Sequence, residues 1–255
     1  MLMGSGGLLV VFLAAWEVLP GLLGLPAFIV PPASKVGAEM IRMASGPDRL
    51  FYHTAITALQ VLAGFALGAL LGMLVGYALG LSPEAEFLLS PYILALQIAP
   101  KVAFAPLFII WFGYTVTPKI LVAVLIVFFP VMVNVIAALR TVDPDTVNLA
   151  RSFTASRAQV FWKIQFPASL PPLFAGLRIA ATLAVIGVVV GEMVGGNTGL
   201  GFLLSFGEGA GNTAMVFVTI LFLTLIGIVL YGLVVLVERR VLHYLPGRDR
   251  LGGAS

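Results

Sequence analysis

The sequence contains no cysteine and few charged side chains. The absence of cysteine excludes disulfide bonds and thiol chemistry in this chain. Asp, Glu, Lys and Arg together make up 10% of the 255 residues, whereas a soluble domain carries about 25%. His53 and His243 are the only histidines, and neither stands beside an acidic pair. A membrane-embedded enzyme would need a cluster of His, Asp or Glu, so we expect that the chain is not an enzyme.

Several motifs that would indicate other functions are also missing. No glycine-rich segment ends in Gly-Lys-Ser or Gly-Lys-Thr with phosphate-loop spacing, so we expect no nucleotide or other cofactor in this chain. The sequence pI is about 9.4, but no basic patch is interleaved with aromatic residues, which disfavours a nucleic-acid partner. No internal repeat is visible, and acidic residues are few within the apolar segments. A secondary transporter is therefore the weaker alternative.

Long apolar segments dominate what the sequence does contain. Hydrophobic residues make up 60% of the chain, and a helix needs about 20 of them to cross a bilayer. Six segments reach or approach that length: Gly7–Leu25, Ala55–Leu81, Phe87–Phe112, Ile120–Leu139, Pro172–Val194 and Thr213–Val237. We therefore predict an all-α, polytopic membrane protein with six transmembrane helices, a single domain over residues 1–255 and direct contact with membrane lipid.

Lysine and arginine are distributed unequally between the two sides of such a protein. Eight lie in the central loop and the C-terminal segment: Arg140, Arg151, Arg157, Lys163, Arg239, Arg240, Arg248 and Arg250. Four lie on the opposite side: Lys35, Arg42, Arg49 and Lys119. Because cytoplasmic loops collect positive charge, we expect both termini in the cytoplasm, with a flexible tail over residues 238–255. Residues 1–6 carry no positive side chain, so we expect a retained first helix, unless Met1 is not the true start.

Glycine recurs at every fourth position along the second apolar segment: Gly64, Gly68, Gly72, Gly76 and Gly80. Residues four apart lie on one side of a helix. In lipid, small residues allow the backbones of neighbouring helices to approach closely and to gain dispersion contacts. We therefore predict that this segment is a central packing helix and has no direct role in transport.

Six polar or charged side chains interrupt the apolar segments: Glu17, Gln97, Lys101, Asn134, Arg178 and Glu192. Such groups are costly in hydrocarbon and should face protein or water. Lys101 follows Pro100, where a broken helix would line a cavity, and Gln97 precedes Lys101 by one helical turn. We predict that these two side chains line the translocation path, together with Asn134 and Glu192.

Most of these side chains also have a structural interpretation. Lys101 could instead pair with Glu192 or extend to an interface. Glu192 could cap or close the loop Gly195–Gly211. We expect Arg178 to extend to the cytoplasmic surface, and Asn134 to form a hydrogen bond between helices.

Two segments lie on the predicted extracytoplasmic side. The segment Pro26–His53 contains an amphipathic stretch that suits a helix on the membrane surface, with Ser34 as its cap. The loop Gly195–Gly211 mixes glycine with apolar residues and suits a short element at the outer surface. Glu17, in the first apolar segment, is expected to form a hydrogen bond between helices.

The loop 140–171 is polar and lies between two apolar segments. Asp143 before Pro144 is typical of a helix start, because the Asp oxygen accepts a hydrogen bond from an orphan backbone N–H. Ser156 and Gln159 form a capping box, which starts a second helix. That helix is expected to stop at the prolines that follow it: Pro167, Pro171 and Pro172. We predict a helix–turn–helix element that docks a partner.

The same loop resembles the signature of the membrane subunits of bacterial ATP-binding cassette importers. Their pattern is Glu-Ala-Ala, three residues, Gly, nine residues, Ile, one residue and Leu-Pro. This chain has the same spacing: Asn148-Leu149-Ala150, Thr154, Ile164 and Phe166-Pro167. Further similar segments cover nearly the whole chain: Leu62–Phe65, Pro100–Ala103, Pro106–Leu107, Trp111–Gly113, Gly176–Arg178, Gly191–Met193 and Gly199–Gly201.

This chain departs from the family pattern at four positions. Asn148 replaces Glu, Leu149 replaces the first Ala, Thr154 replaces Gly, and Phe166 replaces Leu. The Asn lacks a charge that would pair with a partner, and Thr tolerates a left-handed turn less well than Gly. Such changes would weaken or retune coupling, or would mark a branch with a relaxed motif.

The resemblance implies a type I importer permease in the bacterial inner membrane. It also implies that a short coupling helix, about Pro144–Phe153, fits a groove in a separate ATPase dimer, which holds ATP and Mg²⁺. The residues implied in that contact are Asn148, Leu149, Ala150, Arg151, Phe153, Thr154, Ala155 and Arg157. The other implied partners are a second copy of the chain and an extracytoplasmic substrate-binding protein, and the implied mechanism is alternating access.

The resemblance narrows the substrate to a branch of the family. That branch imports taurine and other sulfonates, nitrate, thiamine or pyrimidine precursors, and riboflavin. The segment Phe128–Val131 with Asn134, together with Pro100 and Lys101, favours a pyrimidine precursor or a riboflavin-like solute. A cation at Lys101 suits a sulfonate or another anion equally well, so a sulfonate, taurine or nitrate importer is the alternative.

Overall fold

The computed structural model describes residues 2–243, with side chains from residue 6 onward. Its elements are α1 (Leu2–Leu22), α2 (Ala33–Ser45), α3 (Leu50–Gly80), α4 (Pro83–Ile98), the 3₁₀ helix η1 (Lys101–Phe104), α5 (Ala105–Phe112), α6 (Val116–Arg140), α7 (Pro144–Ser152), α8 (Arg157–Val160), the π-helical turn η2 (Phe161–Gln165), α9 (Phe166–Gly195), α10 (Leu200–Gly209) and α11 (Thr213–Val241). No strand occurs within the described range, so the predicted all-α class is confirmed. The tail predicted over residues 238–255 begins inside α11, and residues 244–255 lie outside the described part.

Four helices are individually long and apolar enough to cross a membrane: α3, α6, the continuous helix Arg157–Gly195 and α11. A fifth span is possible if two shorter helical segments are counted together: α4, and the segment Lys101–Phe112 formed by η1 and α5. The chain bends by 80° between them. α1 contributes a shorter apolar helix, Gly6–Leu22, over its described side chains. By length and composition the described chain thus has four or five spans, whereas the sequence predicts six.

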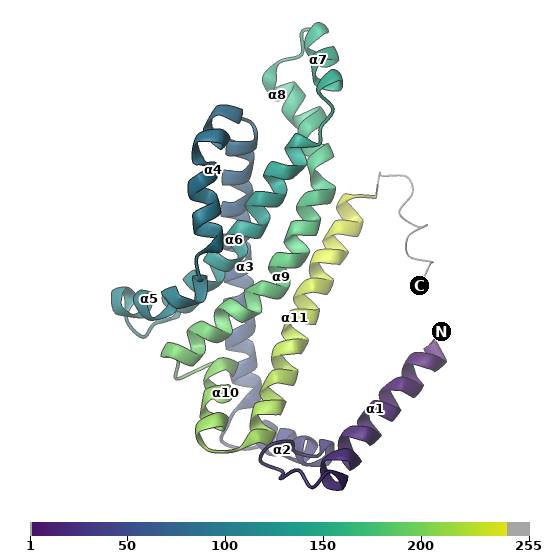
Figure 1. Ribbon diagram of the computed structural model, residues 1–255, viewed down its shortest axis with the longest axis vertical. Coiled ribbons are helices and arrows are strands. Elements are labelled where there is room, and N and C mark those ends of the chain that lie inside the picture. The colour runs from purple at the N-terminus through teal and green to yellow at the C-terminus, as the bar shows by residue number, and fades with distance from the viewer. Residues whose placement is uncertain (1, 244–255) are drawn as a thin grey trace.

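The predicted third span, Phe87–Phe112, is broken in the middle. Ala99 has an extended backbone with ψ of 137°, as expected for a residue that precedes proline. Pro100 also lacks the N–H that would continue the helical hydrogen bonds. α4 therefore ends before the proline, and α5 projects to one side of the molecule (Figure 1). Gln97 and Lys101 consequently do not share one face of a continuous helix.

α6 lies between α3 and α9 and forms the centre of the packed core. The glycine row of α3 faces α6, because a Cβ atom at Gly68 would lie 2.8 Å from the Cβ atom of Val127. On the opposite side, a Cβ atom at Gly187 of α9 would lie 2.6 Å from the Cα atom of Ala123. The predicted close packing along α3 is confirmed. The central helix is α6, however, since it meets glycines from both neighbours.

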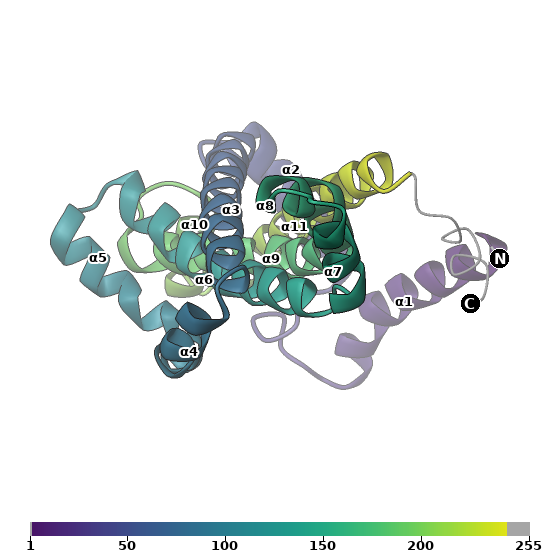
Figure 2. The same cartoon turned by 90° about the horizontal axis from the view of Figure 1, so that it is seen from above.

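α1 stands apart from the core helices in both views (Figure 1, Figure 2). At its end, the indole N–H of Trp16 donates to the carbonyl oxygen of Pro31 at 3.1 Å. The Glu17 carboxylate accepts hydrogen bonds from the backbone N–H and the hydroxyl of Ser34, at 2.8 and 2.7 Å. The predicted helix–helix hydrogen bond of Glu17 is confirmed. The prediction of Ser34 as a cap is wrong, because Pro32 is the N-cap of α2 and a carboxylate from α1 satisfies its first turn.

α8, η2 and α9 form one continuous helix of 39 residues, Arg157–Gly195. The prolines at positions 167, 171 and 172 lie within it, so the prediction that they end the second helix is wrong. Membrane helices tolerate proline because π-type turns and side-chain hydroxyls satisfy the freed backbone groups. Here η2 precedes the first proline, and the hydroxyl of Ser169 donates to the carbonyl oxygen of Phe166 at 2.8 Å. At 1.5 Å per residue, this helix is about 58 Å long.

Candidate functional site

The loop 140–171 contains two helices whose starts are capped as predicted. The Asp143 carboxylate accepts a hydrogen bond from the backbone N–H of Asp145 at 2.9 Å, and Pro144 is the first residue of α7. The Ser156 hydroxyl accepts from the backbone N–H of Gln159 at 3.3 Å, and the Gln159 side chain accepts from the backbone N–H of Ser156 at 2.8 Å. Both caps are formed within a few residues, so the local sequence determines where α7 and α8 begin.

The turn between α7 and α8 is left-handed at Thr154, where φ is +60°. The backbone N–H of Thr154 donates to the carbonyl oxygen of Arg151 at 2.9 Å, and that of Ala155 donates to Ala150 at 3.1 Å. This pair of bonds is a Schellman motif, in which glycine usually occupies the left-handed position. A β-branched residue is an outlier there. The motif explains in physical terms why the family pattern has glycine at the position of Thr154.

Two large apolar side chains are exposed on this loop. Leu149 is 60% exposed and Phe153 is 78% exposed. They lie one helical turn apart, since the backbone N–H of Phe153 donates to the carbonyl oxygen of Leu149 at 3.2 Å. Ala150 and Ala155 are half-buried and border a hollow of about 190 Å³ between α7 and α8. Four polar residues of the predicted contact are exposed around them: Asn148, Arg151, Thr154 and Arg157.

α7 and α8, with the turn between them, lie at one end of the molecule, opposite α2 and α10 (Figure 1). The continuous helix Arg157–Gly195 starts at this loop and ends near α10. A displacement of the loop would therefore be transmitted along a single helix through the core.

Gln97 and Lys101 are close together at the break between α4 and η1. The Lys101 ammonium donates to the backbone carbonyl of Gln97, and it lies 4.9 Å from the ring centre of Phe129. The Lys101 side chain folds back over the break to reach this carbonyl group. The hydrogen bond is therefore to the backbone of Gln97 and does not involve its side chain. A cation above an aromatic ring is a favourable pair.

A hollow of about 340 Å³ lies between α4 and α6 and includes Gln97. At its other end, Arg140 forms an ion pair with Glu86, whose side chain is buried. Sequence reasoning assigned Arg140 to the cytoplasmic loop and missed Glu86, which lies one residue before the predicted third span. A carboxylate just outside an apolar segment was the available signal.

Asn134 does not form the expected hydrogen bond between helices. Its side-chain amide donates to the carbonyl oxygen of Pro130 in its own helix, at 2.8 Å. A Cβ atom at Gly176 of α9 would lie 2.8 Å from the Cβ atom of Asn134, so the residue is packed in the α6–α9 contact. Glu192 lies 16 residues after Gly176 in α9, which is about 24 Å along the helix at 1.5 Å per residue. The structure therefore does not bring the four predicted path residues together.

Glu192 is completely buried near the end of α9. Its carboxylate accepts a hydrogen bond from the backbone N–H of Gly201 at 2.7 Å and from the Thr57 hydroxyl at 2.9 and 3.0 Å. The alternative that Glu192 closes the loop after α9 is thus confirmed. Within residues 6–243 no ion pair joins it to Lys101.

Arg178 is held by an ion pair, whereas the sequence suggested extension to the cytoplasmic surface. Its guanidinium lies 2.5 Å from the carboxylate of Glu238 on α11. Glu238 is buried, so the positive charge of Arg178 compensates a carboxylate that would otherwise be costly. The pair joins the first half of α9 to the end of α11.

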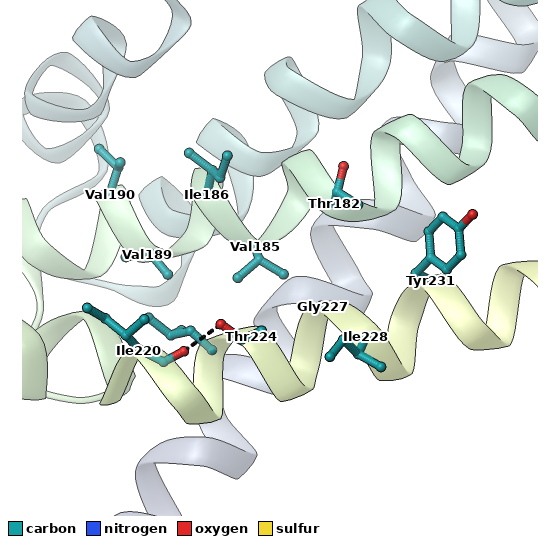
Figure 3. Close-up of a pocket in the computed structure, with 11 residues that line it drawn as sticks. Thr182, Val185, Ile186, Val189, Val190, Ile220, Thr224, Gly227, Ile228 and Tyr231 are labelled. Atoms are coloured by element: carbon teal, nitrogen blue, oxygen red, sulfur yellow. Dashed lines mark hydrogen bonds between the residues drawn. The ribbon is translucent and has the colours of Figure 1, made fainter. Parts of the chain in front are cut away.

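A larger groove of about 510 Å³ lies between α9 and α11 (Figure 3). Its wall consists mainly of valine, isoleucine and leucine side chains. The hydroxyls of Thr182 and Thr224 donate to carbonyl oxygens of their own helices, both at 2.8 Å. Apart from the Tyr231 hydroxyl, the lining side chains are therefore apolar or already paired, and the groove suits an acyl chain or an apolar helix better than a polar solute.

The arrangement described above has a counterpart among known proteins. The model of the family described as "Binding-protein-dependent transport system inner membrane component" matches residues 68–243. The chain belongs to this family. It is a multi-pass inner-membrane permease of the ATP-binding cassette (ABC) importers, and its relatives are transport permeases, not enzymes.

Three curated relatives indicate the branch of the family. The permease is 38% identical over 237 residues to the riboflavin transport system permease protein RibX of Chloroflexus aurantiacus, covering 92% of this chain and 88% of RibX. It is 32% identical to the formylaminopyrimidine transport permease protein ThiX of Halalkalibacterium halodurans, with 90% of each chain covered. It is 34% identical to the taurine transport system permease protein TauC of Escherichia coli, covering 80% of this chain and 76% of TauC.

A solved structure supports the fold of the permease. A chain of the MetNI methionine ABC transporter, in an inward-facing conformation, matches with a TM-score of 0.64 at 16% sequence identity. The match covers 77% of the permease and 99% of that chain. The helical arrangement is therefore that of a type I importer permease.

Proposed function

We propose that this permease forms the membrane pathway for a small organic solute. We further propose that it is driven by a separate ATPase dimer that docks on the loop 140–171, which we name the coupling loop. The observation that carries the proposal is the exposure of Leu149 and Phe153, at the end of α7 and just before the helix Arg157–Gly195. Large apolar side chains grouped at an exposed end of a protein mark an interaction site. The family to which the chain belongs supports an ATPase as the partner.

The proposed coupling surface consists of Asn148, Leu149, Ala150, Arg151, Phe153, Thr154, Ala155 and Arg157. Leu149 and Phe153 supply its apolar centre, and Arg151 and Arg157 supply a charged rim, which is the usual composition of a protein interface. Asn148 is neutral, so electrostatic attraction to the ATPase rests on the two arginines.

ATP and Mg²⁺ bind in the ATPase partner under this proposal, and the permease changes state by alternating access. Closure of the ATPase dimer would bring two coupling loops together, one from each copy of the permease. A partner shifts a conformational equilibrium only through a difference in binding energy between the two states. A rigid loop is therefore required, and the capping box at Ser156 and the Schellman turn at Thr154 supply that rigidity.

The proposed path includes Gln97 and Lys101, at the break in the bent span. Asn134 and Glu192 are packed against other helices, so we restrict the path to the first pair. We propose a pyrimidine or thiamine precursor or a riboflavin-like solute, and the relatives RibX and ThiX support this class. The alternative is a sulfonate such as taurine, or nitrate, and it is favoured by the ammonium group of Lys101 and by the relative TauC.

The proposed topology has six crossings, with α1 as the first and both termini in the cytoplasm. The excess of Lys and Arg in the coupling loop and from the last turn of α11 to the C-terminus of the sequence supports this orientation. α2 and α10, at the opposite end of the molecule from α7 (Figure 1), would then face the extracytoplasmic substrate-binding protein. The exposed apolar side chains of α1, such as Leu8 and Phe12, would contact lipid or the second copy.

Co-purification with the ATPase encoded beside the permease tests the proposal. Wild type is compared with Leu149→Asp and Phe153→Asp, because a charge at the centre of an apolar contact should weaken binding by about tenfold or more. Phe206→Asp is the control, since it places the same charge at an exposed aromatic residue of α10. If the wild type binds no ATPase, the proposal that an ATPase dimer docks on this loop fails.

A further inference from the structure

The first turn of α10 is held by side chains from other helices. The backbone N–H of Gly199 donates to Nδ1 of His53 at 2.9 Å, and that of Leu200 donates to the hydroxyl of Thr57 at 2.7 Å. The backbone N–H of Gly201 donates to the carboxylate of Glu192 at 2.7 Å. The first turn of a helix leaves four N–H groups without partners inside the helix. Here α3 and α9 provide acceptors for consecutive backbone groups, and we name His53, Thr57 and Glu192 the α10 clamp.

The clamp also joins α3 to α9. Thr57 accepts a hydrogen bond from α10 and donates its own proton to Glu192, at 2.9 and 3.0 Å from the two carboxylate oxygens. Thr57 and Glu192 are fully buried, and His53 is nearly so. A carboxylate is costly in such a place unless it is hydrogen-bonded. The hydrogen bonds from Thr57 and Gly201 to this carboxylate therefore hold the three helices in one arrangement.

The backbone around the clamp fits it closely. Gly199 has φ of +104°, and a Cβ atom there would collide with the Glu192 carboxylate. Lys119 of α6 packs against Gly191, the residue before Glu192, and its ammonium lies 3.4 Å from the carbonyl oxygen of Thr198. Lys119 was predicted to lie in an outer loop, but it is buried within α6. All three core helices thus contribute to the surroundings of the start of α10.

The clamp lies at the far end of the helix that begins at the coupling loop. Ser156 caps that helix at one end, and Glu192 lies three residues before its other end at Gly195. α7 and α10 are at opposite ends of the molecule (Figure 1). A movement of the coupling loop that displaces this helix would act on α10 through the clamp.

We propose that Glu192 and Thr57 are positioning residues that make α10 follow α9, so that the state of the ATPase is transmitted to the extracytoplasmic face. The inference rests on the proposed function for the source of the movement. It gives Glu192 a mechanical role in transport that does not require contact with the solute.

A single cysteine on α10 reports this movement. The chain has no cysteine of its own, so Phe206→Cys, at a half-exposed position of α10, creates a unique site for a maleimide. The complex with the ATPase is placed in lipid nanodiscs, and the labelling rate is measured without nucleotide and with ATP, Mg²⁺ and vanadate. Glu192→Ala and Thr57→Val are introduced in this background. Thr57→Ser, which keeps the hydroxyl, and Glu208→Ala, on the exposed side of α10, are the controls.

We expect ATP to change the labelling rate in the parent and in both controls. In Glu192→Ala and Thr57→Val we expect no response to ATP and a labelling rate about tenfold faster in both states, because buried hydrogen bonds that hold the first turn of α10 are lost. If both variants respond to ATP as the parent does, or if the parent does not respond although ATPase is bound, the inference is overturned. If Glu192→Ala fails to assemble, the comparison of Thr57→Val with Thr57→Ser decides. Co-purification separately measures whether the parent binds the ATPase. If it does not, the proposed function is overturned.

Discussion

Replacement of Thr154 by glycine should stabilise the coupling loop. Thr154 is the left-handed residue of the Schellman turn after α7, with φ of +60°. A left-handed conformation costs an ordinary residue about 1–2 kcal/mol, and glycine avoids that cost. Glycine in turn has more conformational freedom to lose on folding, about 0.5–1 kcal/mol. The difference predicts that Thr154→Gly stabilises the folded turn by about 0.5–1 kcal/mol.

Amide hydrogen exchange of the segment 150–158 measures this effect. A stabilisation of about 0.5–1 kcal/mol slows exchange through local opening by about two- to fivefold. The N–H groups of Thr154 and Ala155 donate the two hydrogen bonds of the turn, so they are the direct reporters. Exchange in α10 is the internal reference, because it should not change.

Ala155→Gly is the matched control for this prediction. Ala155 has no positive φ, so glycine there relieves no strain and should make exchange faster. Opposite signs at two adjacent positions would identify the backbone conformation as the cause. Equal or faster exchange in Thr154→Gly would refute the reasoning about the left-handed turn.

Three further changes test the packing and the charges of the fold. Gly68→Val should lower the thermal midpoint in detergent, because its Cβ atom would lie 2.8 Å from the Cβ atom of Val127 in α6 and overpacking costs about 1–3 kcal/mol. Gly232→Ala, with open space around it, should leave the midpoint unchanged. Arg178→Ala should destabilise by less than the ~3–5 kcal/mol of a fully buried pair, since its side chain is 31% exposed, and leucine at both partners should recover most of the loss. Arg42 lowers the pKa of Glu39 below its ordinary 4.5, so the stabilisation by Glu39 is present above pH 4.5 and is lost as the pH falls further. The thermal midpoint of Glu39→Gln should accordingly change less with acidification than that of wild type, and an equal change would contradict this assignment.

Features that depend on neighbouring residues could be predicted from the sequence. Asp143 and the pair Ser156 and Gln159 cap the helices that they were expected to cap, because such bonds span two or three residues. The four-residue glycine spacing likewise identified the side of α3 that packs closely, since it follows from helix geometry. The identity of the helix that packs there, α6, required the structure.

Features that depend on distant residues or on the membrane could not be predicted in this way. Thr57 and Glu192 meet across 135 positions, and no local pattern indicates that the threonine hydroxyl is a partner. Pro171 and Pro172 read as a helix end by rules for soluble proteins, yet the helix continues through them. Pro100 indicated where the helix could break, but the 80° angle of the bend depends on packing against other helices and could not be predicted.

The most direct test of the central claim is the rate of ATP hydrolysis by the ATPase in lipid, with and without the permease. We predict that wild-type permease changes this rate and that Leu149→Asp and Phe153→Asp abolish the change. The control Phe206→Asp should change the hydrolysis rate as wild-type permease does. Two results would contradict the assignment of α7 and its turn as the coupling surface. One is a hydrolysis rate that the wild-type permease does not change, and the other is a Leu149→Asp permease that changes the rate as much as wild type does.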